Sequence, residues 1–297
     1  MPRICVIYNP VAQGGKARRF LKHRDWFDRD TVFKPTDAPH AATRLAAEAV
    51  AEGFETIVAA GGDGTLSEVL NGFDLVDDSF RKARLAVIPL GTVNVFAKEL
   101  DLPMNLRRAW EVIQRGRERQ VDVGVTEFAR DGKPDRRLFL QLGGAGLDAR
   151  AIELVDWEQK KRLLQFAYVI AGFKALREPL PEITCEADGR LHHGRLVLFG
   201  NGKFYGGRLP VFPRADLADG RLDVCVFKRV NLWLVFRYAL GFVTGLTRLP
   251  SGVEYLQARE FKLTSGTLTP FELEGDLVAH LPVRGSLHPE KLRVVCP

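Results

Sequence analysis

Short apolar runs alternate with helix-patterned segments through the first part of the chain. Four apolar runs predict buried strands over residues 3–8, 31–33, 56–60 and 85–88. Helical patterns between them predict helices over residues 16–24, 41–53 and 66–72. Strands that alternate with helices are typical of a parallel sheet covered by helices. A further helix is predicted over residues 105–116, with Asn105 as a candidate N-cap.

Beyond about residue 121 the pattern changes to short strands separated by turn residues. Strands are predicted over residues 121–126, 137–142, 183–187, 194–201, 222–227 and 292–296. Asp131-Gly132-Lys133-Pro134 and Asp188-Gly189 are hairpin signals. Short strands at this spacing favour a β-sandwich. We therefore predict two domains, residues 1–122 and 123–297, with the last strand as a candidate to pack back on the first domain.

Two apolar segments, residues 157–178 and 231–246, have two interpretations. Neither contains the roughly 18–20 consecutive apolar residues that a membrane-spanning helix needs. Each segment can form a core helix. Trp233, Phe236 and Tyr238 lie near basic residues, an arrangement that also suits docking at a membrane surface.

Charge and cysteine usage narrow the possible environments. The net charge of +6 and the isoelectric point near 9.2 favour binding to phosphate groups on nucleic acid or lipid. A modest positive charge can equally serve only to keep the protein soluble. The sequence contains no helix-turn-helix pattern, RNA-binding motif or long basic tail, so we expect no nucleic-acid partner. Cys5, Cys185, Cys225 and Cys296 are scattered, which predicts buried free thiols in a reducing compartment. The chain begins without a secretory signal pattern, and we expect a cytoplasmic location.

A glycine loop follows the third predicted strand. Gly61-Gly62-Asp63-Gly64-Thr65 leads directly into the helix predicted over residues 66–72. Glycines let backbone N–H groups approach an anion, and the positive end of a helix points to the same place. A carboxylate among these groups suits a metal ligand or a proton acceptor. The loop therefore favours phosphoryl transfer, although an ordinary tight turn has the same composition.

A second loop follows the fourth predicted strand. It reads Pro89-Leu90-Gly91-Thr92-Val93-Asn94-Val95-Phe96-Ala97. Ligands of open α/β sheets bind outside the carboxyl ends of the strands. We therefore expect the two loops to converge on one nucleotide, with Thr92 and Asn94 as partners for phosphate or ribose.

At this separation the two loops resemble those of the diacylglycerol kinase catalytic-domain family, which includes bacterial lipid kinases and sphingosine kinases. The resemblance extends over nearly the whole chain, through Asn9-Pro10, Gly14-Gly15-Lys16, Thr36, residues 143–149, Asn201-Gly202, Gly206-Gly207, residues 219–223 and Glu274-Gly275-Asp276. It implies an α/β, Rossmann-like nucleotide domain, similar to those of NAD kinase and phosphofructokinase, followed by a β-sandwich lipid domain. It also implies ATP and Mg²⁺ as cofactors and a role in lipid metabolism such as phospholipid biosynthesis.

Loop position and the resemblance together indicate the site residues. The candidate nucleotide-binding residues are Asn9, Thr36, Gly61, Gly62, Asp63, Gly64, Thr65, Leu66, Ser67, Thr92 and Asn94. Asp63 is also a candidate carboxylate for Mg²⁺, since that ion binds few carboxylates besides phosphates and waters. The resemblance to bacterial relatives implies Asp276 as the base for the acceptor hydroxyl, and the resemblance to sphingosine kinases implies Asp63. We rank Asp276 first.

One further loop and one further aspartate allow two interpretations each. Asp216, Asp219 and Arg221 correspond to a loop that binds a structural Mg²⁺ in the bacterial relatives, Asp219 through its side chain and the others through carbonyls. A plain Asp-Gly turn accounts for the same residues. Asp148 suits contact with a lipid headgroup, and it equally suits the cap of a helix that begins near Ala149.

The chain departs from the family pattern at several positions. Ser67 stands where Asn is usual, Val95 where Asp is usual, Gln13 replaces a glycine, and Gln141 stands where Asn is frequent. Glu274-Gly275-Asp276 exchanges the two acids of Asp-Gly-Glu, so Asp276 reaches about one methylene less far. These departures favour altered substrate choice or reduced activity.

We therefore predict an ATP-dependent lipid kinase that acts on a diacylglycerol-like or sphingoid-like hydroxyl. We expect a lipid substrate and peripheral contact with the inner face of the membrane. The alternatives are an NAD kinase-like or other kinase with a soluble acceptor, and a non-catalytic lipid-binding regulatory protein. The sequence does not indicate the lipid or the oligomeric state.

Overall fold

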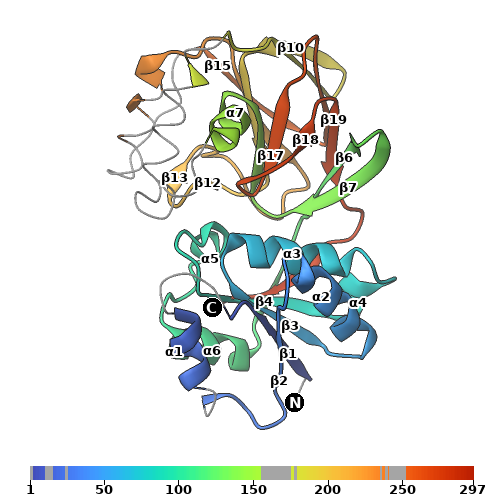
Figure 1. Cartoon of the computed structure of the whole chain (residues 1–297), viewed down its shortest axis with the longest axis vertical. Helices are drawn as coiled ribbons and strands as arrows, with labels where there is room; N and C mark the ends of the chain where they lie inside the picture. The colour runs from blue at the N-terminus through green and yellow to red at the C-terminus, as the bar shows by residue number, and fades with distance from the viewer. Residues whose placement is uncertain are drawn as a thin grey trace. The chain divides into compact units, whose positions relative to one another are not determined.

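The chain folds into two compact units. The computed structural model describes residues 3–10, 16–23, 26–154, 175–176, 179–234, 236–237, 240 and 252–297. One unit comprises Met1–Val123 and Pro289–Pro297, and the other comprises Gly124–His288 (Figure 1). Gln13, Gly14, Gly15, most of the predicted segment 157–178 and most of residues 231–246 lie outside the described residues.

The first unit is built on a six-stranded sheet with the order β2-β1-β3-β4-β20-β5. Its strands are β1 (Ile4–Tyr8), β2 (Val32–Pro35), β3 (Thr56–Gly61), β4 (Arg84–Pro89), β5 (Glu118–Val121) and β20 (Leu292–Val295). Its helices are α1 (Lys16–Lys22), α2 (Ala41–Ala51), α3 (Asp63–Phe73), α4 (Ser79–Lys82), α5 (Val95–Glu99) and α6 (Leu106–Arg115). Strands β1 to β4 are mutually parallel, β20 runs parallel to β4, and β5 is antiparallel to β20.

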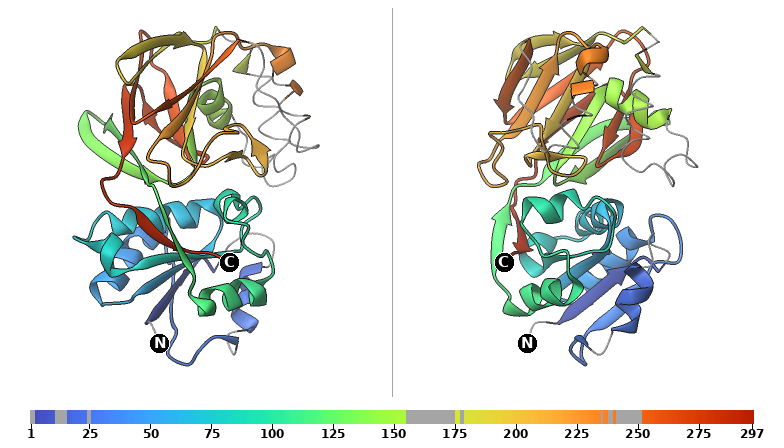
Figure 2. Two further views of the ribbon diagram at one scale, coloured as in Figure 1. Left: turned by 180° about the vertical axis from the view of Figure 1, so that it is seen from behind. Right: turned by 90° about the vertical axis from the view of Figure 1, so that its left-hand side faces the viewer.

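Burial explains why the central strands β1 and β3 are almost entirely apolar, whereas β5 is largely polar and exposed and β2 is only partly buried. Every residue of β1 and of β3 is buried, as expected for parallel strands with both faces covered. Helices α2 and α3 cover one face, and α1 and α6 cover the other (Figure 2). On the α1 and α6 face, the rings of Phe27 and Trp110 lie 4.5 Å apart. The predicted α/β class is confirmed.

The order of the first four strands is 2-1-3-4, whereas the Rossmann order is 3-2-1-4-5-6. The finer Rossmann-like resemblance stays a prediction. The N-cap prediction for α6 is confirmed, because Asn105 Oδ1 accepts a hydrogen bond from Arg108 N at 3.2 Å. Helix α3 begins at Asp63 rather than residue 66, so Asp63, Gly64 and Thr65 belong to its first turn.

The second unit contains two six-stranded antiparallel sheets, with the orders β10-β9-β16-β19-β6-β7 and β15-β14-β11-β8-β17-β18, and a two-stranded ribbon, β12-β13. The first sheet comprises β6 (Gly124–Arg130), β7 (Lys133–Phe139), β9 (Ile183–Ala187), β10 (Arg190–Gly194), β16 (Glu260–Ser265) and β19 (Val283–Leu287). The second comprises β8 (Leu142–Gly146), β11 (Leu196–Gly200), β14 (Leu222–Phe227), β15 (Val253–Ala258), β17 (Pro270–Leu273) and β18 (Asp276–His280). The remaining described elements are β12 (Phe204–Tyr205), β13 (Leu209–Pro210) and α7 (Leu147–Glu153).

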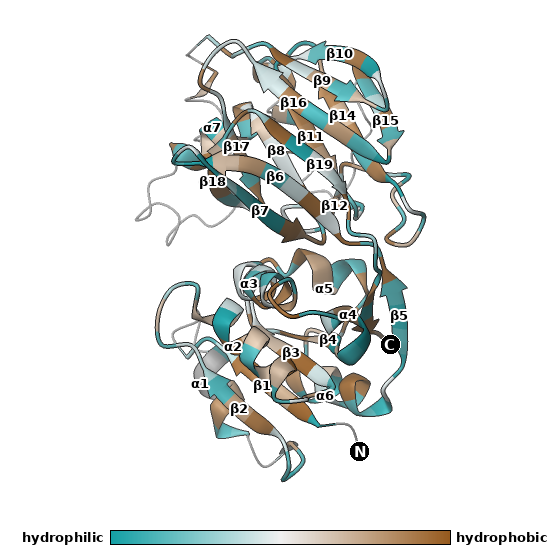
Figure 3. Ribbon diagram, turned by 90° about the vertical axis from the view of Figure 1, so that its right-hand side faces the viewer, coloured by the Kyte–Doolittle hydropathy of each residue, from teal (hydrophilic) through white to brown (hydrophobic). Residues whose placement is uncertain are grey.

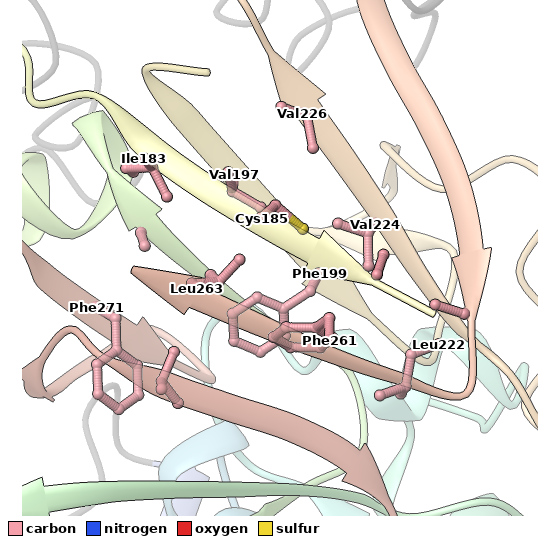
Figure 4. Packing of buried hydrophobic residues seen from close by; sticks show 14 of the residues in the cluster. Ile183, Cys185, Val197, Phe199, Leu222, Val224, Val226, Phe261, Leu263 and Phe271 are labelled. Carbon is pink, nitrogen blue, oxygen red and sulfur yellow. The ribbon is translucent and has the colours of Figure 1, made fainter. Parts of the chain in front are cut away.

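The two sheets share one apolar core, which confirms the predicted β-sandwich. Phe199 comes from one sheet and Phe261 from the other, and their ring centroids lie 4.6 Å apart (Figure 4). Burial of such side chains stabilises the fold by about 25 cal/mol per Å² of apolar surface. Strand β7 is hydrophilic over most of its length and ends in buried apolar residues (Figure 3).

Two predicted strands are wrong in extent. The run 121–126 divides into β5 and β6 at Asp122, which is buried and pairs with Lys291 Nζ at 2.9 Å. The run 137–142 ends as β7 at Phe139, because the next two amides bond to a glutamate side chain and not to a strand. The hairpin predictions are confirmed: Asp131-Gly132 joins β6 to β7, and Asp188-Gly189 joins β9 to β10.

The remaining sequence predictions concern thiols and membrane spans. All four cysteines are free; Cys5, Cys185 and Cys225 are buried as predicted, and Cys296 is half-buried. Burial raises the pKa of the Cys5 and Cys185 thiols to about 12. Among the described residues, no helix combines the length and the apolarity that crossing a bilayer requires.

Candidate functional site

The predicted nucleotide-binding residues gather at the carboxyl edge of the first sheet. The register pairs Tyr8 with both Pro35 and Ala60, and Gly61 with Pro89. The residues that follow these strand ends, Asn9, Thr36, Gly62 and Leu90, therefore lie along one edge. The Thr36 amide also donates to Tyr8 O at 2.9 Å. The chain reverses its direction of strand addition between β1 and β3, which is where ligands of open α/β sheets bind.

The two glycine loops are in direct contact with each other. Gly61 O accepts hydrogen bonds from Leu90 N at 2.8 Å and from Gly91 N at 3.2 Å. A Cβ atom built on Gly91 would lie 2.4 Å from Gly62 Cα, closer than real Cβ contacts allow. Glycine is therefore required at this point because two backbones touch. The structure brings the two loops together, as the sequence predicted.

Asp63 connects the two loops through its side chain. Its Oδ1 accepts a hydrogen bond from Val95 N at 2.7 Å, at the first residue of α5. Burial raises the pKa of this carboxyl, while the amides of Val95, Asn94 and Phe96 act in the opposite direction. Asp63 thus serves as a capping group for a neighbouring helix, a role that the sequence interpretation did not include.

Several groups around these loops suit a polyphosphate. The amides of the first turn of α3 have no acceptor within the helix, and a Cβ atom built on Gly64 would meet nothing within 4 Å. Asn94 Nδ2 donates to Gly91 O at 2.8 Å, whereas Asn94 Oδ1 is buried without a hydrogen-bond partner in the described part of the chain. Lys16 Nζ reaches Gly91 O at 2.9 Å. An open glycine turn, an orphaned acceptor and an ammonium group together fit a nucleotide phosphate with its Mg²⁺.

The other predicted residues of the two glycine loops occupy different environments. Thr92 is exposed, and Thr65 is half-buried beside Gly61. Leu66 is 6% exposed and its amide already donates to Gly62 O at 3.1 Å. Leu66 therefore packs in the core, and neither its side chain nor its amide is available to a ligand.

Three departures from the family pattern can be placed. Ser67 is buried in α3, and Val95 is buried while its amide binds Asp63. The bond between the loops at position 95 thus uses the backbone and does not need an acidic side chain there. Gln141 is buried against Gly202: a Cβ atom there would lie 2.0 Å from Gln141 Oε1.

Two residues of the first unit were missed by sequence reasoning. Lys16 contacts the second loop, and its only signal was its place directly after the first glycine pair. Glu68 accepts hydrogen bonds from His40 N at 3.2 Å and Ala42 N at 3.1 Å. It thereby caps the start of α2 from the neighbouring helix, a contact for which the sequence gave no local signal.

In the second unit, Asp276 lies at the end of a tight hairpin. Glu274 and Gly275 form the two-residue turn between β17 and β18, with φ of 55° and 86°. Asp276 is exposed and pairs with Leu273 across the hairpin. Glu274 Oε1 accepts hydrogen bonds from Leu140 N at 2.7 Å and Gln141 N at 2.9 Å. The longer acid of this pair therefore anchors the turn, and the shorter acid is the exposed one.

A pair of carboxyl groups lies beside this hairpin: Glu272 is buried, and Asp148 is half-buried with its Oδ2 atom buried. Asp148 Oδ1 accepts a hydrogen bond from the Tyr205 hydroxyl, and Glu272 Oε2 accepts one from Gly275 N at 2.8 Å. Burial raises the pKa of both carboxyl groups, and the charge of Asp148 raises that of Glu272 further. Asp148 is the second residue of α7, and the helix has no side-chain N-cap bond, so the capping interpretation is wrong. Sequence reasoning missed Glu272 and Tyr205.

The predicted cation loop lies between β13 and β14. Asp216 Oδ1 accepts from Ala218 N and Asp219 Oδ1 from Arg221 N, each at 3.0 Å. Buried Asp223 has an oxygen without a hydrogen-bond partner among the described residues. Burial is the main cause that raises the pKa of Asp223 to about 6, and the charge of Asp219 adds to it.

These hydrogen bonds are those of Asp-turns, so the turn interpretation accounts for them. Within the described ranges, no three His, Cys, Asp or Glu side chains are grouped for a metal ion. A set of one carboxylate and two carbonyl oxygens does suit a hard cation. A cation beside Asp219 would also offset the cost of the buried Asp223 carboxyl.

Exposed apolar side chains gather at the start of the second apolar segment. Leu232 is 61%, Trp233 66% and Phe236 51% exposed, and the two aromatic rings stack at 5.7 Å. Leu234 N donates to Asn231 Oδ1 at 2.9 Å, which fixes the start of this segment. Lys228 and Arg229 precede it and are exposed. Tyr238 lies outside the described residues.

The described pockets of the second unit lie elsewhere. One, of about 350 Å³, is lined by Glu182, Leu191, His192, His193, Gly194, Arg195, Lys228 and Glu254. Another, of about 520 Å³, lies among residues of β6, β9, β16 and β19. Neither is lined by a residue that the sequence predicted for the site.

Comparisons with known proteins agree with this arrangement. The model of the diacylglycerol kinase catalytic domain matches residues 3–126, and that of the YegS C-terminal NAD kinase beta sandwich-like domain matches residues 143–296. A diacylglycerol kinase of Bacillus subtilis is 29% identical over 95% of this chain and 92% of its own length. One of Staphylococcus aureus is 32% identical over 66% of this chain and 61% of its own.

The fold also matches a solved structure. The crystal structure of a diacylglycerol kinase from Bacillus anthracis superposes with a TM-score of 0.73 over 100% of this chain and 97% of that chain. Its sequence identity of 21% makes this a likeness of fold alone. The two family models together account for most of both units, and the chain belongs to the diacylglycerol kinase catalytic-domain family.

Proposed function

We propose that this protein is an ATP-dependent lipid kinase that transfers the γ-phosphate to a lipid hydroxyl. The observation that carries the proposal is the contact between the two glycine loops, with Asp63 bridging them at 2.7 Å from Val95 N. Phosphoryl transfer depends mainly on positioning the phosphates and stabilising their charge. Loops held this firmly, with open amides beside them, supply that positioning.

On the nucleotide side, each group has a definite task. The amides of the first turn of α3 and the Lys16 ammonium group neutralise phosphate charge. Asn94 Oδ1, buried without a partner in the described chain, accepts from the ligand or contributes to the Mg²⁺ shell. Asn9 and Thr36, at the ends of β1 and β2, contact the rest of the nucleotide. Mg²⁺ supplies charge neutralisation of the transferred phosphoryl group when it is bound.

On the acceptor side, Asp276 serves as the base for the lipid hydroxyl. It is exposed, whereas Asp63 is engaged with the amides of α5. A base needs access to the proton that it takes. This difference in engagement supports the ranking of Asp276 before Asp63. The loop with Asp216, Asp219 and Arg221 holds a structural Mg²⁺, through the Asp219 carboxylate and the two main-chain carbonyls.

The protein reaches its substrate by peripheral contact with an anionic membrane surface. Trp233, Phe236 and Leu232 provide exposed apolar area, and Lys228 and Arg229 provide positive charge beside it. Apolar insertion together with attraction to anionic headgroups is the usual basis of interfacial binding. The ion pair of Lys228 with Glu254, at 2.5 Å, leaves Arg229 as the stronger contributor of charge.

The test is transfer of the γ-phosphate from ATP to lipids in mixed micelles with Mg²⁺. The panel contains a diacylglycerol, a sphingoid base and a polyprenol, with Asp63→Asn as the control. We expect one lipid class to be phosphorylated by the natural protein and not by the variant. Transfer to a soluble acceptor such as NAD, with none to any lipid, would contradict the proposal in favour of an NAD kinase-like activity. Lipid binding without ATP turnover would indicate a regulatory protein.

A further inference from the structure

The carboxyl pair Asp148 and Glu272 is not used by the proposed reaction and needs its own explanation. Glu272 is 0% exposed, and one oxygen of each carboxyl group, Asp148 Oδ2 and Glu272 Oε1, has no donor among the described residues. A buried polar atom without a hydrogen bond costs roughly 1–3 kcal/mol. Two such atoms side by side therefore need a donor that both can use.

The positions of the two oxygens allow them to share one donor. A Cβ atom built on Gly144 would lie 2.8 Å from Asp148 Oδ2 and 3.4 Å from Glu272 Oε1, so both orphaned oxygens border the same small space. The two side chains also interact directly with each other. Two carboxylates cannot donate to each other, but one proton between them provides the missing donor. Two carboxylate charges that border the same small space in the core cannot both persist.

The pair is connected to the hairpin that carries Asp276. The other oxygen of Glu272 accepts from Gly275 N at 2.8 Å, which is the second residue of the turn. On the opposite side, the Tyr205 hydroxyl donates to Asp148. With one proton between the two facing carboxyl oxygens, a chain of hydrogen bonds would run from Tyr205 through Asp148 and Glu272 to Gly275, directly before Asp276.

We propose that Asp148 and Glu272 share one proton and act as positioning residues, which hold the Glu274-Gly275 turn and thereby fix the place of Asp276. This inference rests on the proposed role of Asp276. Neither residue needs to touch the reacting atoms. A second anchor of the same turn, Glu274 on the amides of Leu140 and Gln141, supports the view that the turn is held from two sides.

The surroundings of the pair determine its pH dependence. The groups that face it are Tyr205, Glu274 and the Gly275 amide. Of the packed elements, α7 also carries Arg150 and Glu153, which pair with each other, β18 carries Asp276 and His280, and β8 carries no titratable group. Burial raises the pKa of Glu272 above its unfolded value. The pair therefore contributes stability at low pH that is lost as the pH rises through the raised pKa.

Two substitutions at one position test the proposal. Glu272→Gln keeps an acceptor for Gly275 N and offers a permanent donor to Asp148, whereas Glu272→Met keeps the approximate volume without either. Glu260→Gln, at an exposed position where Glu260 pairs with Arg284, is the matched control. The readouts are hydrogen exchange of the Gly275 amide, the melting temperature against pH, and kcat with KM for ATP.

We expect Glu272→Met to speed exchange of the Gly275 amide and to lower kcat by about tenfold or more, since small misplacements of a catalytic group are costly. KM for ATP stays constant. Glu272→Gln keeps the exchange rate and kcat, and flattens the fall of the melting temperature as the pH rises above the usual pKa of a glutamate. Normal exchange and kcat in Glu272→Met would overturn the proposal, as would equal damage in both variants.

The two hypotheses can fail separately. If the natural protein phosphorylates no lipid, the proposed function fails, and the exchange and melting data still decide whether the pair holds the turn. If lipid is phosphorylated and Glu272→Met behaves like Glu260→Gln, the positioning role is refuted while the kinase function stands.

Discussion

Gly91→Ala tests directly whether the contact between the two glycine loops makes the nucleotide site. The added methyl group would lie 2.4 Å from Gly62 Cα and 2.7 Å from Asn94 Oδ1. Ordinary contact begins at 3.4 Å, so the loops must separate by about 1 Å. Both neighbours belong to the backbone or to a buried side chain, and neither can rotate away easily.

The expected magnitude follows from that displacement. Overpacking of a tight site costs about 1–3 kcal/mol of stability. A misplacement of about 1 Å in a catalytic site can lower the rate about 100-fold. We therefore expect Gly91→Ala to lower the melting temperature by several degrees, to weaken ATP binding, and to reduce kcat/KM for ATP by about 100-fold.

The assay is ATP binding by calorimetry together with thermal unfolding and phosphoryl transfer. Gly64→Ala in the neighbouring loop is the matched control for thermal unfolding alone, because its added Cβ would meet no protein atom within 4 Å but would face the proposed phosphate. Alanine is also favoured over glycine inside a helix, so this variant should keep the stability of the natural protein. A Gly91→Ala protein with natural melting temperature and ATP affinity would refute the argument that backbone contact builds the site.

Three further predictions concern the other parts of the site. Asp63→Asn and Asp276→Asn should each lower kcat by about 100-fold or more. Asp63→Asn should also lower the melting temperature, because it weakens the cap of α5. A near-natural kcat in Asp276→Asn would exclude Asp276 as the base. Mg²⁺ should raise the melting temperature of the natural protein and not that of Asp219→Asn, with half-buried Asp135→Asn, outside this loop, as control. Equal Mg²⁺ responses in Asp219→Asn and the natural protein would support the plain-turn interpretation. The double variant Trp233→Ala, Phe236→Ala should weaken sedimentation with phosphatidylglycerol vesicles about tenfold or more and leave phosphorylation of a short-chain soluble lipid intact. The control Leu268→Ala, at an exposed position, should sediment like the natural protein. Unchanged sedimentation of the double variant would exclude the surface around Trp233 as the membrane contact.

The sequence predicted most of the first unit because its signals are local. Strands β1, β3 and β4 are apolar runs apart from Thr56 and Arg84 at the starts of β3 and β4. The hairpins of the second unit, at Asp131-Gly132 and Asp188-Gly189, are local signals too, because their residues tolerate positive φ. The strand break at Asp122 could not be predicted. It depends on an ion pair with Lys291, which lies far along the chain.

The candidate site shows the same division. Motif spacing placed Gly61 to Thr65 and Thr92 to Asn94 at adjacent strand ends. It did not reveal that the Asp63 carboxylate binds the amide of Val95, or that Glu68 caps α2, because both contacts join separate elements. For the exchanged acids Glu274 and Asp276, only the fold decided which one anchors the turn and which one is exposed.

The sequence by itself thus determined the family and the α/β and β-sandwich classes, and it predicted a nucleotide site at the two glycine loops. These properties follow from residue type, period and spacing along the chain. Tertiary structure alone decided the partners of each carboxyl group: Asp63 at a helix start, Glu274 on two amides, and Asp148 with Glu272 in the core. The physical reason is that a carboxyl group's charge and hydrogen bonds depend on burial and on neighbours that are distant in sequence.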